Sequence, residues 1–367
     1  MHATDALEEA DRLMTVCNSC RYCEGLCAVF PAMEMRRAFS DGDLNYLANL
    51  CHNCGGCYID CQFAPPHEFD VNVPKVLSAV RSDSYAAHVW PQVMSGVFRR
   101  NGLVIALLAA GAIAAFFIGL IMVHDTASLF GAHPDEEGAF YALMHHNAMA
   151  GVFLVVSFYA ALAMVLSIRN FWLAGGAALP VRISSADVWQ AMKDATTMRY
   201  LDGGGPGCYS DEAIGTDKRR FYHHLTFYGF MLCFAATSVA TLYHYLFGLK
   251  APYPWYDLPV VLGTVGGIGL LVGPVGLLLE RKKRDPMVQE NSFRGMDVGF
   301  IVMLFLTSLS GLALMLLRET AAMGVLLSIH LGIVAALFLT MPYGKFMHGL
   351  YRFTALVRYA AERRQHM

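Results

Sequence analysis

Eight of the ten cysteines lie within the first 61 residues and form two runs of identical spacing. The runs are Cys17-x-x-Cys20-x-x-Cys23-x-x-x-Cys27 and Cys51-x-x-Cys54-x-x-Cys57-x-x-x-Cys61. Such a run places three thiolates around one face of a cuboidal iron–sulfur cluster, and its fourth Cys ligates the other cluster. The sequence therefore predicts two [4Fe–4S] clusters that carry single electrons. Their ligand sets would be Cys17, Cys20, Cys23 and Cys61, and Cys51, Cys54, Cys57 and Cys27.

Disulfide bonds and structural zinc are the other common uses of clustered cysteines. The first residues are polar and acidic and lack the basic and apolar regions of a signal peptide, which favours a reducing compartment over disulfides. Zinc takes four ligands and has no use for the further cysteines of each run, so the doubled pattern disfavours zinc. Ala28 and Gln62 stand where ferredoxins usually have proline, which predicts a different local backbone.

The elements that follow this Cys-rich segment are apolar. The chain is 56% hydrophobic and only 15% charged, and the deficit of charge falls after residue 100. Six segments lack Asp, Glu, Lys and Arg and are long enough, or nearly so, to span a bilayer, which takes about 20 helical residues. They are Gly102–Val123, Ala148–Ile168, Leu225–Phe247, Leu258–Leu279, Val298–Leu317 and Val325–Met341.

The distribution of Lys and Arg predicts the topology. Of 27 such residues, 25 fall in segments 1–101, 169–222, 280–297 and 342–367, which alternate with segments that hold the other two. Basic residues concentrate on the cytoplasmic side. We therefore expect both termini, the Cys-rich segment 1–100 and the loop 169–222 in the cytoplasm, and residues 101–367 to form the membrane domain. The glycine cluster at 203–207 is interpreted as a flexible loop that could contact a partner.

Histidines are the candidate ligands near the membrane. His224 and His244 are separated by 20 residues and His330 and His348 by 18, about one hydrocarbon thickness along a helix. Because their helices would be antiparallel, His224 faces His348 near the cytoplasm, and His244 faces His330 near the outer surface. Two facing pairs would suit two b-type haems. Other histidines compete for these places: His223 inside, and His124, His145 and His146 outside.

Other interpretations of these histidines stay open. One haem instead of two, or contact between an extra histidine and a quinone carbonyl, fits the same residues. Each histidine taken singly could also be interfacial and bind a headgroup or a backbone carbonyl.

The whole chain resembles the TcuB/CitB tricarballylate utilisation family. Besides the cysteine runs, the resemblance is carried by Met144-His145-His146-Asn147, by 221–230 (FYHHLTFYGF) and by 339–346 (LTMPYGKF). It implies a bacterial inner-membrane protein with two [4Fe–4S] clusters and haem b. Such a protein would reoxidise the reduced flavin of a cytoplasmic tricarballylate dehydrogenase and pass electrons to the quinone pool. His330 and His348 also resemble a haem-ligand pair on one helix of the diheme subunit of respiratory nitrate reductases.

Together these observations predict an all-α membrane protein. A six-transmembrane-helix, haem-binding bundle would carry an N-terminal, two-cluster, ferredoxin-like [4Fe–4S] domain. The expected role is electron transfer from a cytosolic FAD protein to quinone, and the sequence shows no hydride site, catalytic acid–base pair or nucleic-acid-binding patch. Reverse flow from quinol to a flavoprotein reductase, a membrane redox sensor and a transporter are the alternatives; the absence of intramembrane carboxylates argues against the last.

Overall fold

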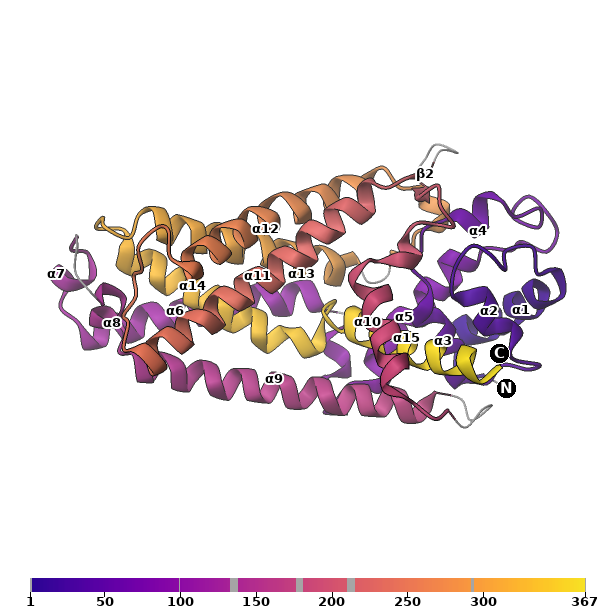
Figure 1. Cartoon of the computed structure of the whole chain (residues 1–367), viewed down its shortest axis with the longest axis horizontal. Helices are drawn as coiled ribbons and strands as arrows, with labels where there is room; N and C mark the ends of the chain where they lie inside the picture. Colours follow the sequence, from indigo (N-terminus) through magenta and orange to yellow (C-terminus); the bar gives the residue numbers. More distant parts are fainter. Residues whose placement is uncertain are drawn as a thin grey trace.

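The computed structural model describes residues 2–98, 100–132, 138–175, 181–209, 215–291 and 294–366. The molecule is elongated, with long helices over most of its length and short helices gathered at one end, where both termini lie (Figure 1). Below, the end formed by short helices is called the head. Between the six long helices and the head runs the C-terminal helix, α15 (Met347–His366).

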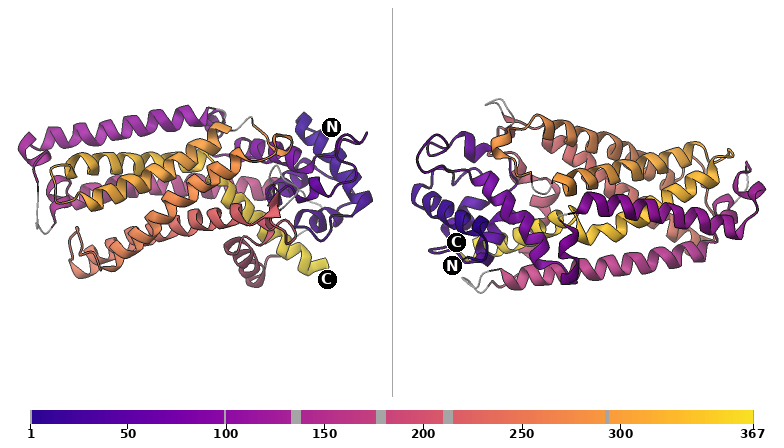
Figure 2. Two further views of the ribbon diagram at one scale, coloured as in Figure 1. Left: turned by 90° about the horizontal axis from the view of Figure 1, so that it is seen from above. Right: turned by 180° about the vertical axis from the view of Figure 1, so that it is seen from behind.

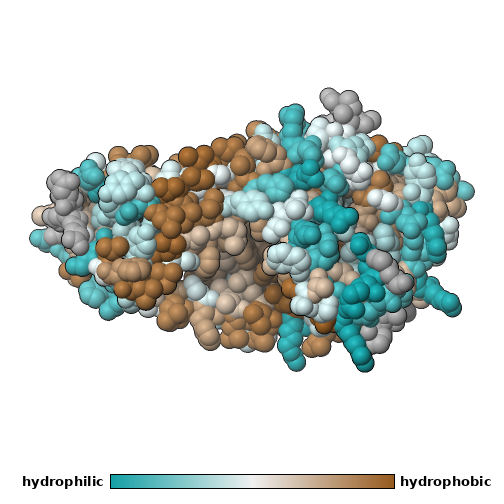
Figure 3. Space-filling view, viewed as in Figure 1, coloured by the Kyte–Doolittle hydropathy of each residue, from teal (hydrophilic) through white to brown (hydrophobic). Residues whose placement is uncertain are grey.

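The six predicted spans are confirmed as helices long and apolar enough to cross a membrane. Most extend past the predicted limits because polar residues continue the helix beyond the hydrocarbon. Figure 3 shows the corresponding belt of hydrophobic side chains, with hydrophilic surface at both ends. The helices are α6 (Asn101–Val123), α9 (His146–Ala174), α11 (Lys218–Phe247), α12 (Leu258–Lys282), α13 (Arg294–Leu316) and α14 (Met323–Thr340).

Glycines permit the closest helix pair of the bundle, α11 with α12. A Cβ added to Gly229 would lie 2.8 Å from the Gly266 carbonyl oxygen, and one added to Gly266 would lie equally close to that of Gly229. At Gly273 the added atom would meet the Thr226 hydroxyl at 2.5 Å. Small residues are what allow two membrane helices to approach at backbone distance. The glycines of residues 263–276 therefore pack helices.

The head is built from short helices whose ends are set by side-chain caps. Thr4 accepts a hydrogen bond from the Leu7 amide at the start of α1, and Ser40 with Asp43 forms a capping box on α3. Arg21 adopts a left-handed conformation with φ of 55°, which ends α1 just after Cys20. The helices are α1 (Asp5–Cys20), α2 (Val29–Glu34), α3 (Asp41–Leu50), α4 (Gly56–Ile59) and α5 (Val73–His88).

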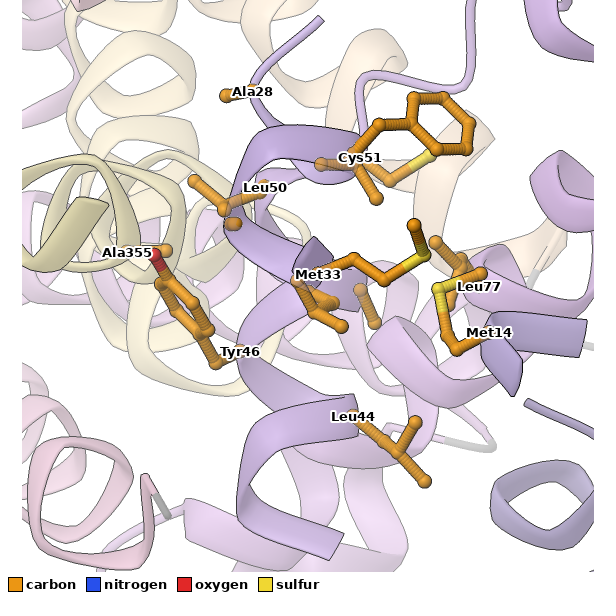
Figure 4. Packing of buried hydrophobic residues seen from close by; sticks show 14 of the residues in the cluster. Met14, Ala28, Met33, Leu44, Tyr46, Leu50, Cys51, Leu77 and Ala355 are labelled. Carbon is orange, nitrogen blue, oxygen red and sulfur yellow. The ribbon is translucent and has the colours of Figure 1, made fainter. Parts of the chain in front are cut away.

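The core of the head includes residues from the far end of the sequence. Met14, Met33 and Leu77 turn toward one another, and Ala355 of α15 lies beside Tyr46 of α3 (Figure 4). Helix α10 (Ser185–Thr196) packs on α15 and adds Ala191 to the same core. The N-terminal segment therefore buries its apolar surface with the help of two elements from beyond residue 100.

A buried ionic network ties α15 to the head. The Arg36 guanidinium lies 2.7 Å from Glu362 Oε1 and 2.8 Å from Asp43 Oδ1, and neither the Arg36 nor the Glu362 side chain is exposed. Arg358 donates to the same Glu362 oxygen at 2.8 Å, and the Tyr46 hydroxyl donates to the other at 3.1 Å. The contact between Arg36 and Glu362 joins residues 326 positions apart.

Short elements complete the described chain. The only strands among the described residues form one antiparallel pair, β1 (Cys208–Tyr209) with β2 (Gly215–Thr216), in which Cys208 faces Thr216. A 3-10 turn, η4 (Met341–Tyr343), separates α14 from α15. The other short elements are α7 (Thr126–Leu129), α8 (Ala139–Leu143) and the 3-10 turns η1 (Gln92–Val97), η2 (Arg199–Leu201) and η3 (Pro286–Val288).

Candidate functional site

The first cysteine group surrounds a cavity at the end of α1. The cavity has a volume of about 200 Å³. Cys20 is exposed, and Tyr22 beside it is 73% exposed, so this side of the head is open to solvent. The cysteines that line the cavity are Cys17, Cys20, Cys23, Cys57 and Cys61.

The second group lines a smaller, adjacent cavity between the two cysteine loops. Its cysteines are Cys27, Cys51, Cys54 and Cys57. Cys57 borders both cavities, so the two groups are neighbours. The structure thus brings together the same two sets of four that the crossover pattern predicts, with Cys61 joining the first run and Cys27 the second. That the eight thiols ligate iron stays a prediction.

The geometry of these thiols suits a bulky cofactor better than a single ion. Within the described ranges, no three Cys, His, Asp or Glu side chains come close enough to hold one metal ion. Burial, with the charge of neighbouring thiols, raises the pKa of Cys17 to about 12 and that of Cys54 to about 11. Since a metal ligand must be a thiolate, these groups lose their protons in exchange for a cation. The cavity and the donor set fit [4Fe–4S] clusters.

Four arginines converge on the backbone of the second cysteine loop. Arg81 and Arg352 donate to the Cys51 carbonyl oxygen at 2.5 and 2.8 Å. Arg219 donates to the Asn53 carbonyl at 2.7 Å, and Arg284 donates to the Asn53 side chain at 2.6 Å. They come from α5, α15, α11 and the segment after α12. We call Arg81, Arg219, Arg284 and Arg352 the arginine cluster.

The arginine cluster has an excess of positive charge. In the part of the chain that the structure describes, no carboxylate lies within salt-bridge distance of any of the four guanidinium groups. Burial and the charge of Arg219 lower the pKa of Arg284 to about 9, and burial and Arg81 lower that of Arg352 to about 10. A [4Fe–4S] cluster with four thiolates is an anion. The positive charge of the arginine cluster therefore suits an anionic [4Fe–4S] cluster at Cys27, Cys51, Cys54 and Cys57.

The glycine-rich loop covers this second group instead of projecting into solvent. The Tyr209 amide donates to the Cys54 carbonyl at 2.8 Å, and the buried Cys208 thiol donates to the Leu201 carbonyl. Gly203 has φ of 60°, and a Cβ there would lie 2.2 Å from the Gly207 oxygen and 3.7 Å from Cys54 Sγ. Glycine is required at position 203 because φ is positive there and the Gly207 carbonyl leaves no room for a Cβ.

Beyond the arginine cluster lies a pair of histidines. Arg219 precedes His223 by one helical turn on α11, and His348 precedes Arg352 by one turn on α15, so each pair shares a helix face. The His223 and His348 ring centres are 6.0 Å apart with an interplanar angle of 64°. Two imidazoles that bind one metal from opposite sides, with bonds of about 2.0–2.1 Å, have centres roughly 6 Å apart. This pair fits the two axial ligands of a haem.

The hydrogen bonds of the pair agree with that role. His348 Nδ1 lies 2.5 Å from the Lys345 carbonyl, which leaves Nε2 available, and His223 Nδ1 is buried without a partner. Burial, with the charges of Lys345 and Arg352, holds the pKa of His348 well below its ordinary value. His348 is therefore a neutral imidazole, the form that ligates iron.

The structure corrects two details of the predicted inner pair. The partner of His348 is His223, whereas His224 stacks on Tyr228 at 5.9 Å. Adjacent residues on a helix point about 100° apart, so only one of the two can face α15. His330 and His348 also stand on different helices, because η4 and the extended backbone at Gly344 interrupt the helix between them.

The predicted outer pair of His244 with His330 is not formed. His330 Nδ1 lies 3.0 Å from the Ser310 hydroxyl, and its ring lies against Gly311 of α13. His244 stacks instead on His146, with ring centres 3.5 Å apart and planes at 19°. Both of these rings have a buried Nδ1 without a hydrogen-bond partner. Rings this close leave no room for a metal between them, so the outer arrangement does not fit a second haem.

The sequence did not single out several residues of the site. Arg81, Arg284 and Arg352 approach the second cysteine loop only through tertiary packing. A usable signal was the spacing of four residues between Arg219 and His223 and between His348 and Arg352, which puts cation and imidazole on one face.

Comparisons with known proteins cover nearly all of the chain. Residues 96–367 match the model of the family "Citrate utilization protein B", and residues 10–87 match that of the "Citrate utilization protein B Fer4-like domain". The chain is 47% identical over 363 residues to citrate utilization protein B of Escherichia coli, covering 99% of this chain and 94% of that one. No solved structure matches. The chain is a multi-pass membrane protein with a ferredoxin-like domain, and it belongs to the citrate utilization protein B family.

Proposed function

We propose that this protein carries electrons from a cytosolic flavoprotein dehydrogenase to the quinone pool. The partner that the family resemblance implies is an FAD-dependent tricarballylate dehydrogenase. When bound, two [4Fe–4S] clusters supply one-electron carriers, so a two-electron donor is oxidised in single steps. The chain's own residues hold these groups, set the charge around them and exclude water.

One observation carries the proposal: the ligand groups are arranged in a series. The first cysteine group opens to solvent at the head, and the second is its neighbour through Cys57. The arginine cluster binds the second cysteine loop, and its Arg219 and Arg352 are each one turn from His223 and His348. The series therefore runs from the surface of the head to the end of the membrane helices.

The charge distribution supports a cytoplasmic head in a bacterial inner membrane. The predicted basic segments all lie at the end of the molecule that carries the head and both termini (Figure 1). Basic residues mark the cytoplasmic side. A flavoprotein in the cytosol can then reach the open first cysteine group.

We propose that His223 and His348 hold one haem b near the cytoplasmic surface. The separation of their rings and the neutral state of His348 suit axial ligation. The stacked rings of His146 and His244 leave that pair without a haem in this arrangement. We further propose that quinone receives the electrons within the membrane domain.

The test is a cofactor inventory of purified protein with matched variants. We expect iron and acid-labile sulfide for two cubane clusters and one haem b per chain. His223→Ala and His348→Ala should each lower the haem content, while the neighbouring change His224→Ala should leave it unchanged. Zinc as the only metal, or unchanged haem in both variants, would refute the assignment. Reoxidation of a reduced flavoprotein by quinone in proteoliposomes would then test the direction of flow.

A further inference from the structure

Helix α10 has an inverted polarity. Its two carboxylates, Asp187 and Asp194, are only 3% and 5% exposed. Its large apolar residues point outward, with Trp189 68%, Met192 43% and Val188 39% exposed, and the small Ala191 is buried. A helix on the surface of a soluble domain shows the opposite pattern. Val188, Trp189 and Met192 follow the spacing of one helix face, and we call them the apolar stripe of α10.

Ion pairs explain why the acidic face is buried. Arg364 of α15 donates to both oxygens of Asp187, at 2.9 and 2.8 Å. Arg199 lies 3.5 Å from Asp194. The contact of Asp187 with Arg364 joins the polar side of α10 to α15, and Asp194 is satisfied locally by Arg199, which follows α10 in the chain. The rotation of α10 about its own axis is thereby determined. The apolar stripe is left facing away from the protein.

The position of α10 points to the lipid surface as the group that covers the stripe. The helix runs across the long axis of the molecule, where the membrane helices meet the head, and stands out from the body beside α15 (Figures 1 and 2). The Tyr228 hydroxyl donates to the Thr196 carbonyl at 3.0 Å. Tyr228 belongs to the first turn of the third apolar segment, so the C-terminal end of α10 lies at the level of the membrane boundary.

We propose that α10 lies in the plane of the cytoplasmic leaflet and buries its apolar stripe at the boundary between headgroups and acyl chains. A tryptophan on the apolar side is typical of interfacial helices. Lys193 beside the stripe and Arg182 before the helix are exposed and can meet lipid phosphates. The stripe also continues the lipid-facing surface of α11, where Tyr228 is 46% exposed. This goes beyond electron transfer and does not depend on any cofactor.

The experiment measures which medium surrounds Trp189. The full-length protein is placed in nanodiscs of phosphatidylethanolamine and phosphatidylglycerol, with or without bromine at positions 6 and 7 of the acyl chains. The emission of Trp189 is obtained as the difference between the native protein and Trp189→Phe, which cancels the other three tryptophans. Phe69→Trp in the Trp189→Phe protein, at a position 42% exposed on the head, supplies a water-facing control.

Brominated lipid should quench the Trp189 emission by roughly half or more, because an interfacial helix buries its apolar face about 5–10 Å into this boundary. The same emission should resist aqueous acrylamide better than the control tryptophan does. Acrylamide quenching equal to the control without an effect of bromine would overturn the proposal. Protection from acrylamide that requires added cytosolic protein would assign the stripe to a protein partner and would equally overturn it.

Discussion

Removal of the Glu362 charge should loosen the head, although Glu362 lies near the opposite end of the sequence. Glu362→Gln keeps the shape of the side chain but leaves Arg36 with Asp43 as its one remaining anion among the described residues. Breaking a buried ion pair by removing one partner costs about 3–5 kcal/mol. The Arg36 and Glu362 side chains have no exposure to water, so solvent cannot replace the lost contact.

Hydrogen exchange measured by mass spectrometry gives a direct assay. Amides that exchange by local opening report the free energy of that opening. At about 1.4 kcal/mol per factor of ten, the change should accelerate exchange on the order of 10²- to 10³-fold or more. The effect is expected in peptides from α3 and from the C-terminal half of α15. Exchange in α12 of the membrane bundle should not change.

The matched control is an exposed ion pair of the same chemistry. Arg12 lies 2.6 Å from Glu9, and both side chains are about two-fifths exposed, at 43% and 38%. Such pairs contribute roughly 0.2–1 kcal/mol. Arg12→Gln should therefore change exchange by at most about fivefold. If Glu362→Gln had no greater effect than this control, the argument that the network joins α15 to the head would be wrong.

Three further predictions concern the second cysteine loop and α10. Arg352→Gln and Arg284→Gln should each lower the reduction potential of the proposed iron–sulfur cluster at Cys51, because a lost cation disfavours the more negative reduced state. Redox titration followed by electron paramagnetic resonance measures the potential, and an unchanged potential would refute the prediction. Gly203→Val should speed the loss of iron to a chelator, since its Cβ would clash with the Gly207 carbonyl at positive φ, whereas Gly25→Val, with open space around it, should not. The Arg364 guanidinium holds the pKa of Asp187 well below its usual range, so the Asp187 contribution to stability is present above about pH 4 and lost as pH falls through the lowered pKa. Local opening of α10, measured by hydrogen exchange of its amides, should increase over that acid range. Arg364→Gln should abolish this pH dependence.

Features encoded by local sequence were predictable. The cysteine spacing predicted that the fourth cysteine of each run joins the other run, and Cys61 and Cys27 do lie beside those runs. That these groups ligate clusters stays a prediction. The six membrane helices followed from length and absence of charge, two properties that need no knowledge of the fold. The break after α14 was missed, although Pro342 and Gly344 both disfavour a continuous helix.

Choices between neighbours depended on tertiary packing. Nothing in the pair His223 and His224 shows which ring faces α15, because that depends on the rotation of α11 as a whole. The partner of His244 was missed for a similar reason. His244 stacks on His146 at the start of α9, whereas His330 of α14 is hydrogen-bonded to Ser310 of α13. The arginine cluster gathers residues from four separate elements, and no window of sequence contains more than one of them.

The ionic network between Arg36 and Glu362 has a consequence for the order in which the chain matures. A ribosome delivers the Cys-rich segment and Asp43 first, whereas Glu362, the second anion bound to Arg36, is synthesised after all six hydrophobic helices. The core of the head therefore stays incomplete until α15 has been synthesised, because Ala355 and Leu356 belong to it.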